Sequence, residues 1–168
     1  EHRNLTSSQF GQYFQQYRSK YYMIDVEAYQ YGGKLRFAGI WVENKQNISW
    51  RENRNLTSSQ FSQKFNDYKQ QGFRMIDVES YRSGGTQYYA GIWVENKPKI
   101  GWAEHRNLTS SQFHQKFNTY RQMGWRLIDV EGYKQASSTT YYAGIWAENT
   151  DDVRWREHRN LTSQQFGD

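Results

Sequence analysis

Pairs of carboxylates recur along the chain with constant spacing, and they are the residues whose types could carry out chemistry. The two members of each pair lie two residues apart on an expected strand, so both side chains point to the same face. Such pairs could serve in general acid–base catalysis or bind calcium through hard oxygen ligands. The pairs are Asp25 and Glu27, Asp77 and Glu79, and Asp129 and Glu131.

Arginines recur with the same period as the carboxylates. They are Arg3, Arg54, Arg106 and Arg159, which are 51, 52 and 53 residues apart. Because both sets repeat together, arginine–carboxylate contacts between successive units would account for them without any ligand. We therefore interpret the arginines and carboxylates as a polar ladder between repeats.

Rows of aromatic residues form the second set of candidates. Each row residue shares a strand face with a glycine, and a flat ring beside such a gap could stack on a sugar, with avidity from repetition. Alternatively, the rings join the units to one another, which is the interpretation we favour. Alternation then places Ala90, Ile92 and Val94 on the opposite face, against the helix. The row comprises Trp41, Trp93 and Trp146 with Phe37, Tyr89 and Tyr142, and a second row of Trp50, Trp102 and Trp155 is open to the same two interpretations.

Nothing in the sequence singles out one catalytic site, because every candidate occurs in triplicate. None of the serines begins a Ser-x-x-Lys pattern, and the chain contains no cysteine. His105 and His158 take the place of Asn53 in another repeat, which argues against a shared metal site. We therefore expect a protein without enzymatic activity, metal or cofactor.

Five Asn-x-Ser/Thr sequences are potential N-glycosylation sites. They are Asn4, Asn47, Asn55, Asn107 and Asn160. For all except Asn47, the start of a helix already explains the pattern, because asparagine is favoured where the chain turns. In a secreted eukaryotic protein these sites would carry glycans, whereas in a bacterial protein they would be incidental.

The phrase RNLTSSQF, which contains each arginine, predicts the start of a helix. Thr57 is a good N-cap and Gln60 can complete a capping box, while Leu56 and Phe61 occupy the positions of a hydrophobic staple. Apolar residues then recur at helical spacing up to Gly72, a plausible C-terminal stop. The helix should span about three turns.

Each expected helix is followed by two segments with strand character. RMIDVESY and TQYYAGIWVEN flank Gly84-Gly85 and so predict a β-hairpin. A third short strand, KIGWAEHR, leads into the next helix. The predicted fold is α+β, a tandem array or partial barrel with repeats at 1–53, 54–105 and 106–158 and a fourth beginning at 159–168. The repeats differ in length at only two places, before Tyr21 and near Ser137, which indicates that both places are loops.

Composition limits the class of protein. Aromatic residues make up 18% of the chain, and a single unit is too small to bury a sufficient core, so stability should come from stacking of neighbouring repeats. The net charge of +5 is dispersed, which favours a solvated surface over nucleic-acid binding. No apolar run is long enough to enter a membrane.

The order and spacing of these motifs resemble the bacterial tandem repeat family. The resemblance is carried by Trp102, Arg106, Leu108, Thr109, Gln112 and Phe113, by Gly124, Trp125, Arg126, Leu127, Val130, Gly132 and Tyr133, and by Tyr142, Ala143, Ile145 and Trp146. In that family such repeats often form a non-catalytic domain beside a β-lactamase-like serine hydrolase, as in secreted polyglycine hydrolases. The resemblance implies an extracellular accessory or assembly role.

We therefore expect an extracellular structural or assembly module whose partners are further repeats or copies of itself. Two alternatives remain: a carbohydrate or cell-wall binding module, and an accessory domain of a secreted serine hydrolase. The chain opens with EHRNL and repeats it from Glu157, which predicts a longer array or a cap on a neighbour.

Overall fold

The computed structural model describes residues 1–136 and 138–167, and it contains three successive units of the same design. Each unit is a short strand, a helix and two long strands, which confirms the predicted α+β tandem-repeat fold. The elements are β1 (His2–Leu5), α1 (Ser7–Tyr17), β2 (Tyr21–Tyr31) and β3 (Lys34–Glu43); β4 (Trp50–Leu56), α2 (Ser58–Gln70), β5 (Phe73–Ser83) and β6 (Thr86–Glu95); β7 (Trp102–Leu108), α3 (Ser110–Gln122), β8 (Trp125–Lys134) and β9 (Thr140–Glu148); and α4 (Ser163–Gly167).

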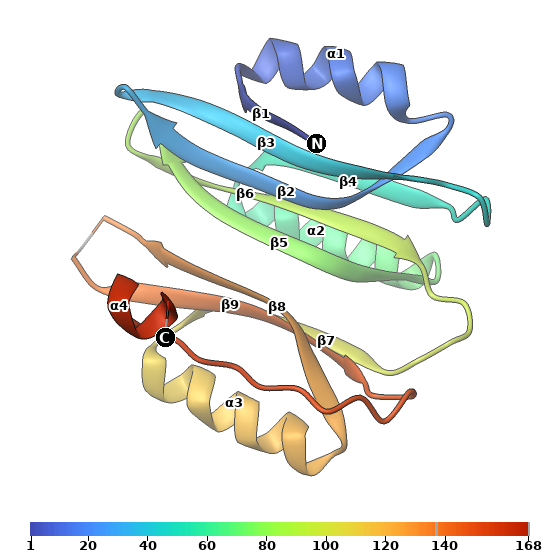
Figure 1. The fold of residues 1–168 in the computed structure, drawn as a ribbon, viewed down its shortest axis with the longest axis vertical. Helices are drawn as coiled ribbons and strands as arrows, with labels where there is room; N and C mark the ends of the chain where they lie inside the picture. The colour runs from blue at the N-terminus through green and yellow to red at the C-terminus, as the bar shows by residue number, and fades with distance from the viewer. Residues whose placement is uncertain (137, 168) are drawn as a thin grey trace.

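Each unit forms its own three-stranded antiparallel sheet, in the orders β1-β3-β2, β4-β6-β5 and β7-β9-β8. Figure 1 shows the sheets following one another, with α1 and α3 at opposite ends of the molecule. Within the described residues the sheets do not close into a barrel. The array is therefore open.

The short strand pairs with the hairpin that follows it along the chain. Trp50 lies opposite Val94, and Trp102 lies opposite Ala147. The structural unit therefore begins at the short strand, and the predicted boundaries at 53/54 and 105/106 fall inside β4 and β7. Sequence similarity located the period correctly but could not show with which hairpin the strand pairs.

The helices begin as the sequence predicts. In α2 the Gln60 amide donates to Thr57 Oγ1, and the Thr57 amide donates to Gln60 Oε1 over 2.9 Å, which completes the capping box. The same box starts α1 and α3. Gly72 follows α2 with a φ of 83°, as expected of a glycine that ends a helix. Without that glycine, α1 has 11 residues where α2 has 13.

The hairpin between β5 and β6 turns at Gly84 and Gly85, whose φ values are 55° and 81°. Two successive positive φ angles suit a tight two-residue turn that matches the twist of the strands. The predicted hairpin is thus confirmed. The length difference near Ser137 concerns the third hairpin, and Ser137 lies outside the described residues.

The helix of each unit lies on the aromatic face of its sheet. The Phe61 ring centroid is 5.7 Å from that of Tyr89 and 5.8 Å from that of Trp93. Ala90 and Ile92 lie on the opposite face and pack against the first repeat. The prediction that Ala90, Ile92 and Val94 face the helix is therefore wrong. The alternation was correct, but the apolar stripe of the helix packs on the large rings, and the smaller residues face the neighbouring sheet.

A glycine beneath each row tryptophan makes room for the indole. A Cβ atom on Gly39 or Gly91 would lie 2.8 Å from the Cη2 atom of Trp41 or Trp93, and one on Gly144 would lie 2.7 Å from that of Trp146. Real Cβ atoms do not approach so closely. The ring of the tryptophan itself therefore fills the gap that the sequence suggested for a sugar.

Substitution Gly91→Ala should lower the free energy of unfolding by about 1–3 kcal/mol, because the added methyl overpacks the core. Gly132→Ala is the matched control, since its Cβ would lie 3.6 Å from the nearest Tyr142 atom, an ordinary contact. Urea denaturation followed by tryptophan fluorescence measures both. Equal stability of the two variants would contradict the packing described here.

Candidate functional site at the repeat junctions

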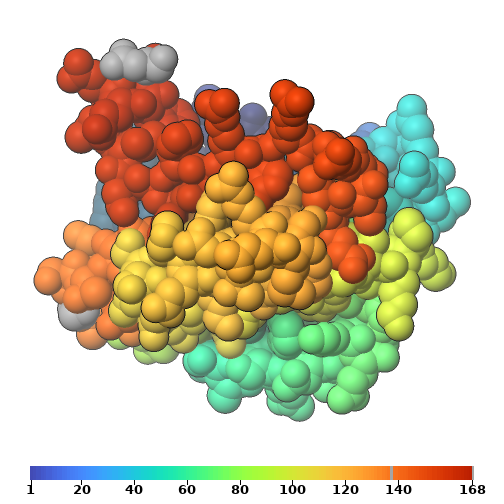
Figure 2. Space-filling model, turned by 90° about the horizontal axis from the view of Figure 1, so that it is seen from below, coloured from blue at the N-terminus to red at the C-terminus, as the bar shows by residue number. Residues whose placement is uncertain are grey.

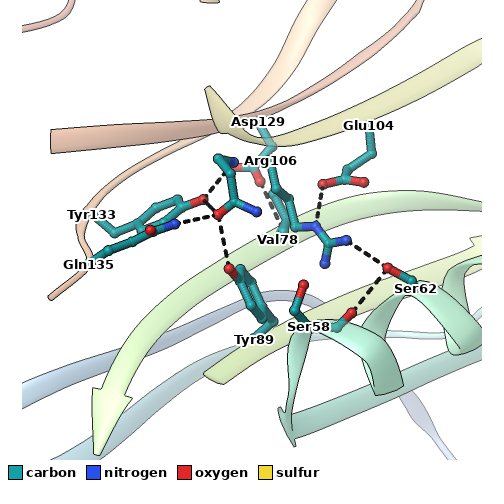
Figure 3. Close-up of polar contacts among 10 residues, drawn as sticks. Ser58, Ser62, Val78, Tyr89, Glu104, Arg106, Asp129, Tyr133 and Gln135 are labelled. Carbon is teal, nitrogen blue, oxygen red and sulfur yellow. Dashed lines mark hydrogen bonds and ion pairs between the residues drawn. The ribbon is translucent and has the colours of Figure 1, made fainter. Parts of the chain in front are cut away.

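An arginine from the start of each repeat binds the repeat before it. The Arg106 guanidinium carbon lies 3.9 Å from the ring centroid of Phe61 and 4.9 Å from that of Tyr89, both in the second repeat. Its Nε atom lies 3.3 Å from Glu104 Oε1, and its Nη2 atom donates to Ser62 Oγ over 3.1 Å. Figure 3 shows Arg106 between Glu104 and the helix that carries Ser62. We call this arrangement the arginine clamp.

The clamp recurs at the other junctions. Arg54 lies 4.2 Å from the Phe10 ring centroid, and Arg159 lies 4.0 Å from that of Phe113. Planar guanidinium groups stack well on aromatic rings. Arg3 differs, because it is exposed and no earlier repeat precedes it within the described residues.

The predicted ladder between the arginines and the paired carboxylates is wrong. The ionic partners of the clamp arginines are Glu52, Glu104 and Glu157, each two residues before its arginine. The paired carboxylates lie on the middle of β2, β5 and β8 instead. The sequence carries a signal for the true partners, because residues two apart on a strand share a face and each of these glutamates lies two residues before its arginine.

The paired carboxylates nevertheless join successive repeats. Asp77 accepts a hydrogen bond from the backbone amide of Val26 over 3.1 Å, and Asp129 accepts one from Val78 over 2.9 Å. Figure 3 shows Asp129 above Val78. Each aspartate therefore fastens its sheet to the edge of the preceding sheet. Asp25, in the first repeat, is the counterpart of Asp77 and Asp129.

Burial and mutual repulsion perturb this group of carboxylates. Burial, followed by the charges of Glu131 and Glu27, raises the pKa of Glu79 far above its usual range. Burial also raises the pKa of Asp129 to about 7 and, with the charges of Glu27 and Asp129, that of Glu131 to about 8. These mutual effects mean that all three repeats contribute carboxylates to one region. We call the six residues Asp25, Glu27, Asp77, Glu79, Asp129 and Glu131 the carboxylate cluster.

The first tryptophan row is buried. The exposed fraction is 9% for Trp41 and 0% for Trp93 and Trp146. The neighbouring Phe37, Tyr89 and Tyr142 are buried as well. These rings cannot stack on a glycan, so the prediction of a sugar site on this row is wrong. The rings form the core instead, and their indole N–H groups have no hydrogen-bond partner among the described residues.

The second tryptophan row crosses the junctions. Trp50 meets Phe14 edge to face with centroids 5.4 Å apart, and Trp102 meets Phe65 in the same way at 5.2 Å. Trp155 does so with Phe117 at 5.3 Å. Of the two interpretations of this row, contact between units is the one its geometry supports.

The asparagines of the repeated phrase hold tyrosine hydroxyl groups. Asn55 and Asn107 both have a φ of 58°, in the left-handed region that asparagine tolerates. The backbone N–H of Asn107 donates to the Tyr133 hydroxyl over 2.8 Å, while the side-chain oxygen Oδ1 of Asn107 accepts hydrogen bonds from the hydroxyls of Tyr133 and Tyr89. These contacts give the asparagines a structural role. Glycosylation at Asn4, Asn47, Asn55, Asn107 and Asn160 stays a prediction.

The exchange of histidine for asparagine between repeats also has a structural explanation. His105 Nε2 lies 2.7 Å from the Tyr120 hydroxyl, and Asn53 Oδ1 accepts a hydrogen bond from the Tyr68 hydroxyl over 2.8 Å. Either side chain can accept this bond. Burial, together with the charge of Lys116, lowers the pKa of His105 to about 4. In the described part of the chain, no group of three or more His, Asp or Glu residues is arranged to hold a metal ion.

Comparison with known families places the chain. The sequence profile of the polyglycine hydrolase-like structural repeat matches residues 1–44, 47–96 and 99–149. The chain belongs to this structural repeat family. The matched segments contain whole β-α-β-β units of the structural repeat, so they agree with the sheets. A search of curated proteins found no match.

Removing the clamp arginine should destabilise this structural repeat. Arg106→Ala leaves Glu104, whose side chain is 6% exposed, without its cation, which should lower the free energy of unfolding by about 3 kcal/mol. Arg3→Ala removes the exposed counterpart and should change it by less than about 0.5 kcal/mol. Chemical denaturation compares the two variants. Similar losses from the two variants would contradict the junction role assigned to Arg106 and Glu104.

The carboxylate cluster should make stability depend on pH. Its folded pKa values exceed the unfolded values near 4, so the folded chain binds more protons, and the free energy of unfolding should fall as pH rises from about 4 to about 8. Glu79→Gln removes one buried acid and should raise stability at pH 8 by about 1–3 kcal/mol, with a weaker pH dependence. The control is Glu43→Gln, at an exposed site. Thermal melts at several pH values are the measurement, and stability that increased toward pH 8 would contradict the assignment.

Proposed function

We propose that this chain is a non-enzymatic structural module that acts outside the cell as a rigid section of a repeat array. The observation that carries the proposal is that the repeated side chains that could take part in catalysis or ligand binding are engaged in contacts within and between repeats. The arginines stack on the preceding helix, the aspartates bind the preceding sheet, and the row tryptophans fill the cores.

The family description supports this role, because it names the repeat as structural. The resemblance to repeats of secreted hydrolases supports the extracellular setting, and so does the potential glycosylation site Asn47, which no helix start explains. The hydrolase named in the family description also supports the alternative of an accessory domain beside a serine hydrolase. Among the described residues, no helix has both the length and the apolarity required to cross a membrane.

A structural module should hold its ends at a fixed separation. The chain has no cysteine, so spin labels can be attached uniquely at Gln12→Cys and Gln115→Cys, which are exposed and occupy equivalent positions on α1 and α3. Double electron–electron resonance should give one narrow distance distribution. Adding Arg106→Ala should broaden it, whereas adding Arg3→Ala should leave it unchanged.

A broad distribution in the unsubstituted background would overturn the rigid-module proposal. The proposal that the chain is not an enzyme would be overturned if the purified chain hydrolysed a polyglycine or glycan substrate and a single substitution abolished that activity.

A further inference from the structure

A groove lies beside the second-row tryptophan at each internal junction between repeats. At the junction of the second and third repeats its volume is about 540 Å³, and Trp102 and Trp125 line it together with Ile100. At the junction of the first and second repeats the equivalent groove has a volume of about 500 Å³, and Trp50 and Ile48 line it. Complete repeats lie on both sides of these two grooves. We call them the junction grooves.

The junction grooves lie along one side of the molecule. The loops after β3 and β6, which contribute to them, are both on the right in Figure 1, and Figure 2 shows them in cyan and yellow-green at the right of the surface. The segment after β9, with Trp155, lines a similar groove against α3. One extended ligand can therefore reach successive grooves.

An asparagine fixes the shape of the loop at each junction groove. The side-chain amide of Asn96 donates to the Ile100 carbonyl over 2.9 Å, and its side-chain oxygen accepts a hydrogen bond from the Ile100 backbone N–H over 3.2 Å. Asn44 makes the same pair of hydrogen bonds with Ile48, at 2.9 and 2.8 Å. Because the loops are already ordered, a ligand would lose little affinity to ordering them.

Exposed cations line both junction grooves. The Lys69 ammonium nitrogen lies 5.5 Å from the ring centroid of Trp102, so positive charge and apolar surface are adjacent there. The cations are Lys69 and Lys99 in the groove beside Trp102, and Arg18 and Arg51 in the groove beside Trp50.

The acidic residues at the junction grooves have other partners. Glu52 lines the groove beside Trp50, but its side chain is 5% exposed and forms the ion pair with Arg54. Glu148 accepts a hydrogen bond from the Gly101 backbone N–H over 2.8 Å. The grooves therefore favour anionic ligands over cationic ones.

We propose that the junction grooves bind an acidic polysaccharide, a linear polymer of sugars that carry carboxylate groups. The C–H groups of a sugar ring would contact the aromatic rings, and its carboxylates would pair with the lysines and arginines. Occupation of successive grooves by one polymer would add avidity. The second-row tryptophans keep their contacts between units, since Trp102 both meets Phe65 and lines the groove. This inference goes beyond the proposed structural function, to which it adds a ligand.

Half-buried rings and sparse cations favour a polysaccharide over a single-stranded nucleic acid. Proteins bind single strands with open ring faces on which bases stack, and a nucleic acid carries a phosphate on every unit. Trp102 is 9% exposed, which is too little for a base to stack on it. Each junction groove is lined by only two cations, which suits a polymer of lower charge density.

Calorimetric titration with polygalacturonate at about 0.15 M salt tests the proposal. The unsubstituted chain should bind this polymer. Methyl-esterified polygalacturonate, which keeps the sugars but lacks the charges, should bind at least about tenfold more weakly.

Reversal of one charge in each groove, by Arg18→Glu together with Lys69→Glu, should weaken binding of polygalacturonate by at least about tenfold. The matched control is Lys34→Glu together with Lys134→Glu, which changes the net charge equally at two exposed residues that do not line the junction grooves. Both variants should fold, because all four residues are exposed, and the melting temperature verifies this.

Failure of the unsubstituted chain to bind polygalacturonate would overturn the proposal. Equal weakening by the control pair would overturn it too, because net charge alone would then explain the binding. Polyglutamate that bound as tightly would exclude recognition of the sugar, and single-stranded DNA that bound more tightly would identify nucleic acid as the partner instead. The spin-label distances are measured without polysaccharide, so failure of this binding is distinguishable from failure of the structural function.

Discussion

Stacking of a guanidinium group on an aromatic ring of the preceding repeat is the interaction on which the array depends. The ring has to lie at the first turn of the helix, where the capping box and staple place Phe61. The charge has to be balanced inside the junction, which Glu104 does from the same strand. The short strand has to deliver both residues to the helix of its neighbour. The repeated phrase RNLTSSQF therefore specifies the contact between two repeats as well as the start of a helix.

The carboxylate cluster opposes this attraction. Buried carboxylates from three repeats repel one another and lose hydration, and only part of that cost is offset by hydrogen bonds such as Asp129 to Val78. The same aspartates nevertheless fix the position of one sheet on the next, because each binds a single backbone amide. Different residues therefore supply stability and alignment. The arginine stacked on an aromatic ring stabilises the junction, and the aspartate fixes the position of one sheet on the next.

Local structure could be predicted from the sequence, because its determinants are local. Thr57 and Gln60 are three residues apart, and Gly84 and Gly85 need only their own backbone freedom. What lay across a sheet could not be predicted. Alternation assigned Trp93 and Ile92 to opposite faces correctly, but which face meets the helix depends on a neighbour more than forty residues away. The partner of Arg106 was predictable, because Glu104 lies two residues before it on the same strand and therefore shares its face.

The short strand also determines how such an array can change its length. β7 pairs with β9 of its own sheet, yet Trp102 packs on Phe65 of the preceding helix, so neither repeat is complete without the other's segment. A gene duplication or deletion that joined the chain at the arginines would build one short strand from parts of two different repeats. One that joined it within the loops near Asn47 and Lys99 would transfer a whole sheet with its helix. Recombination in those loops would therefore add or remove repeats without remaking a junction.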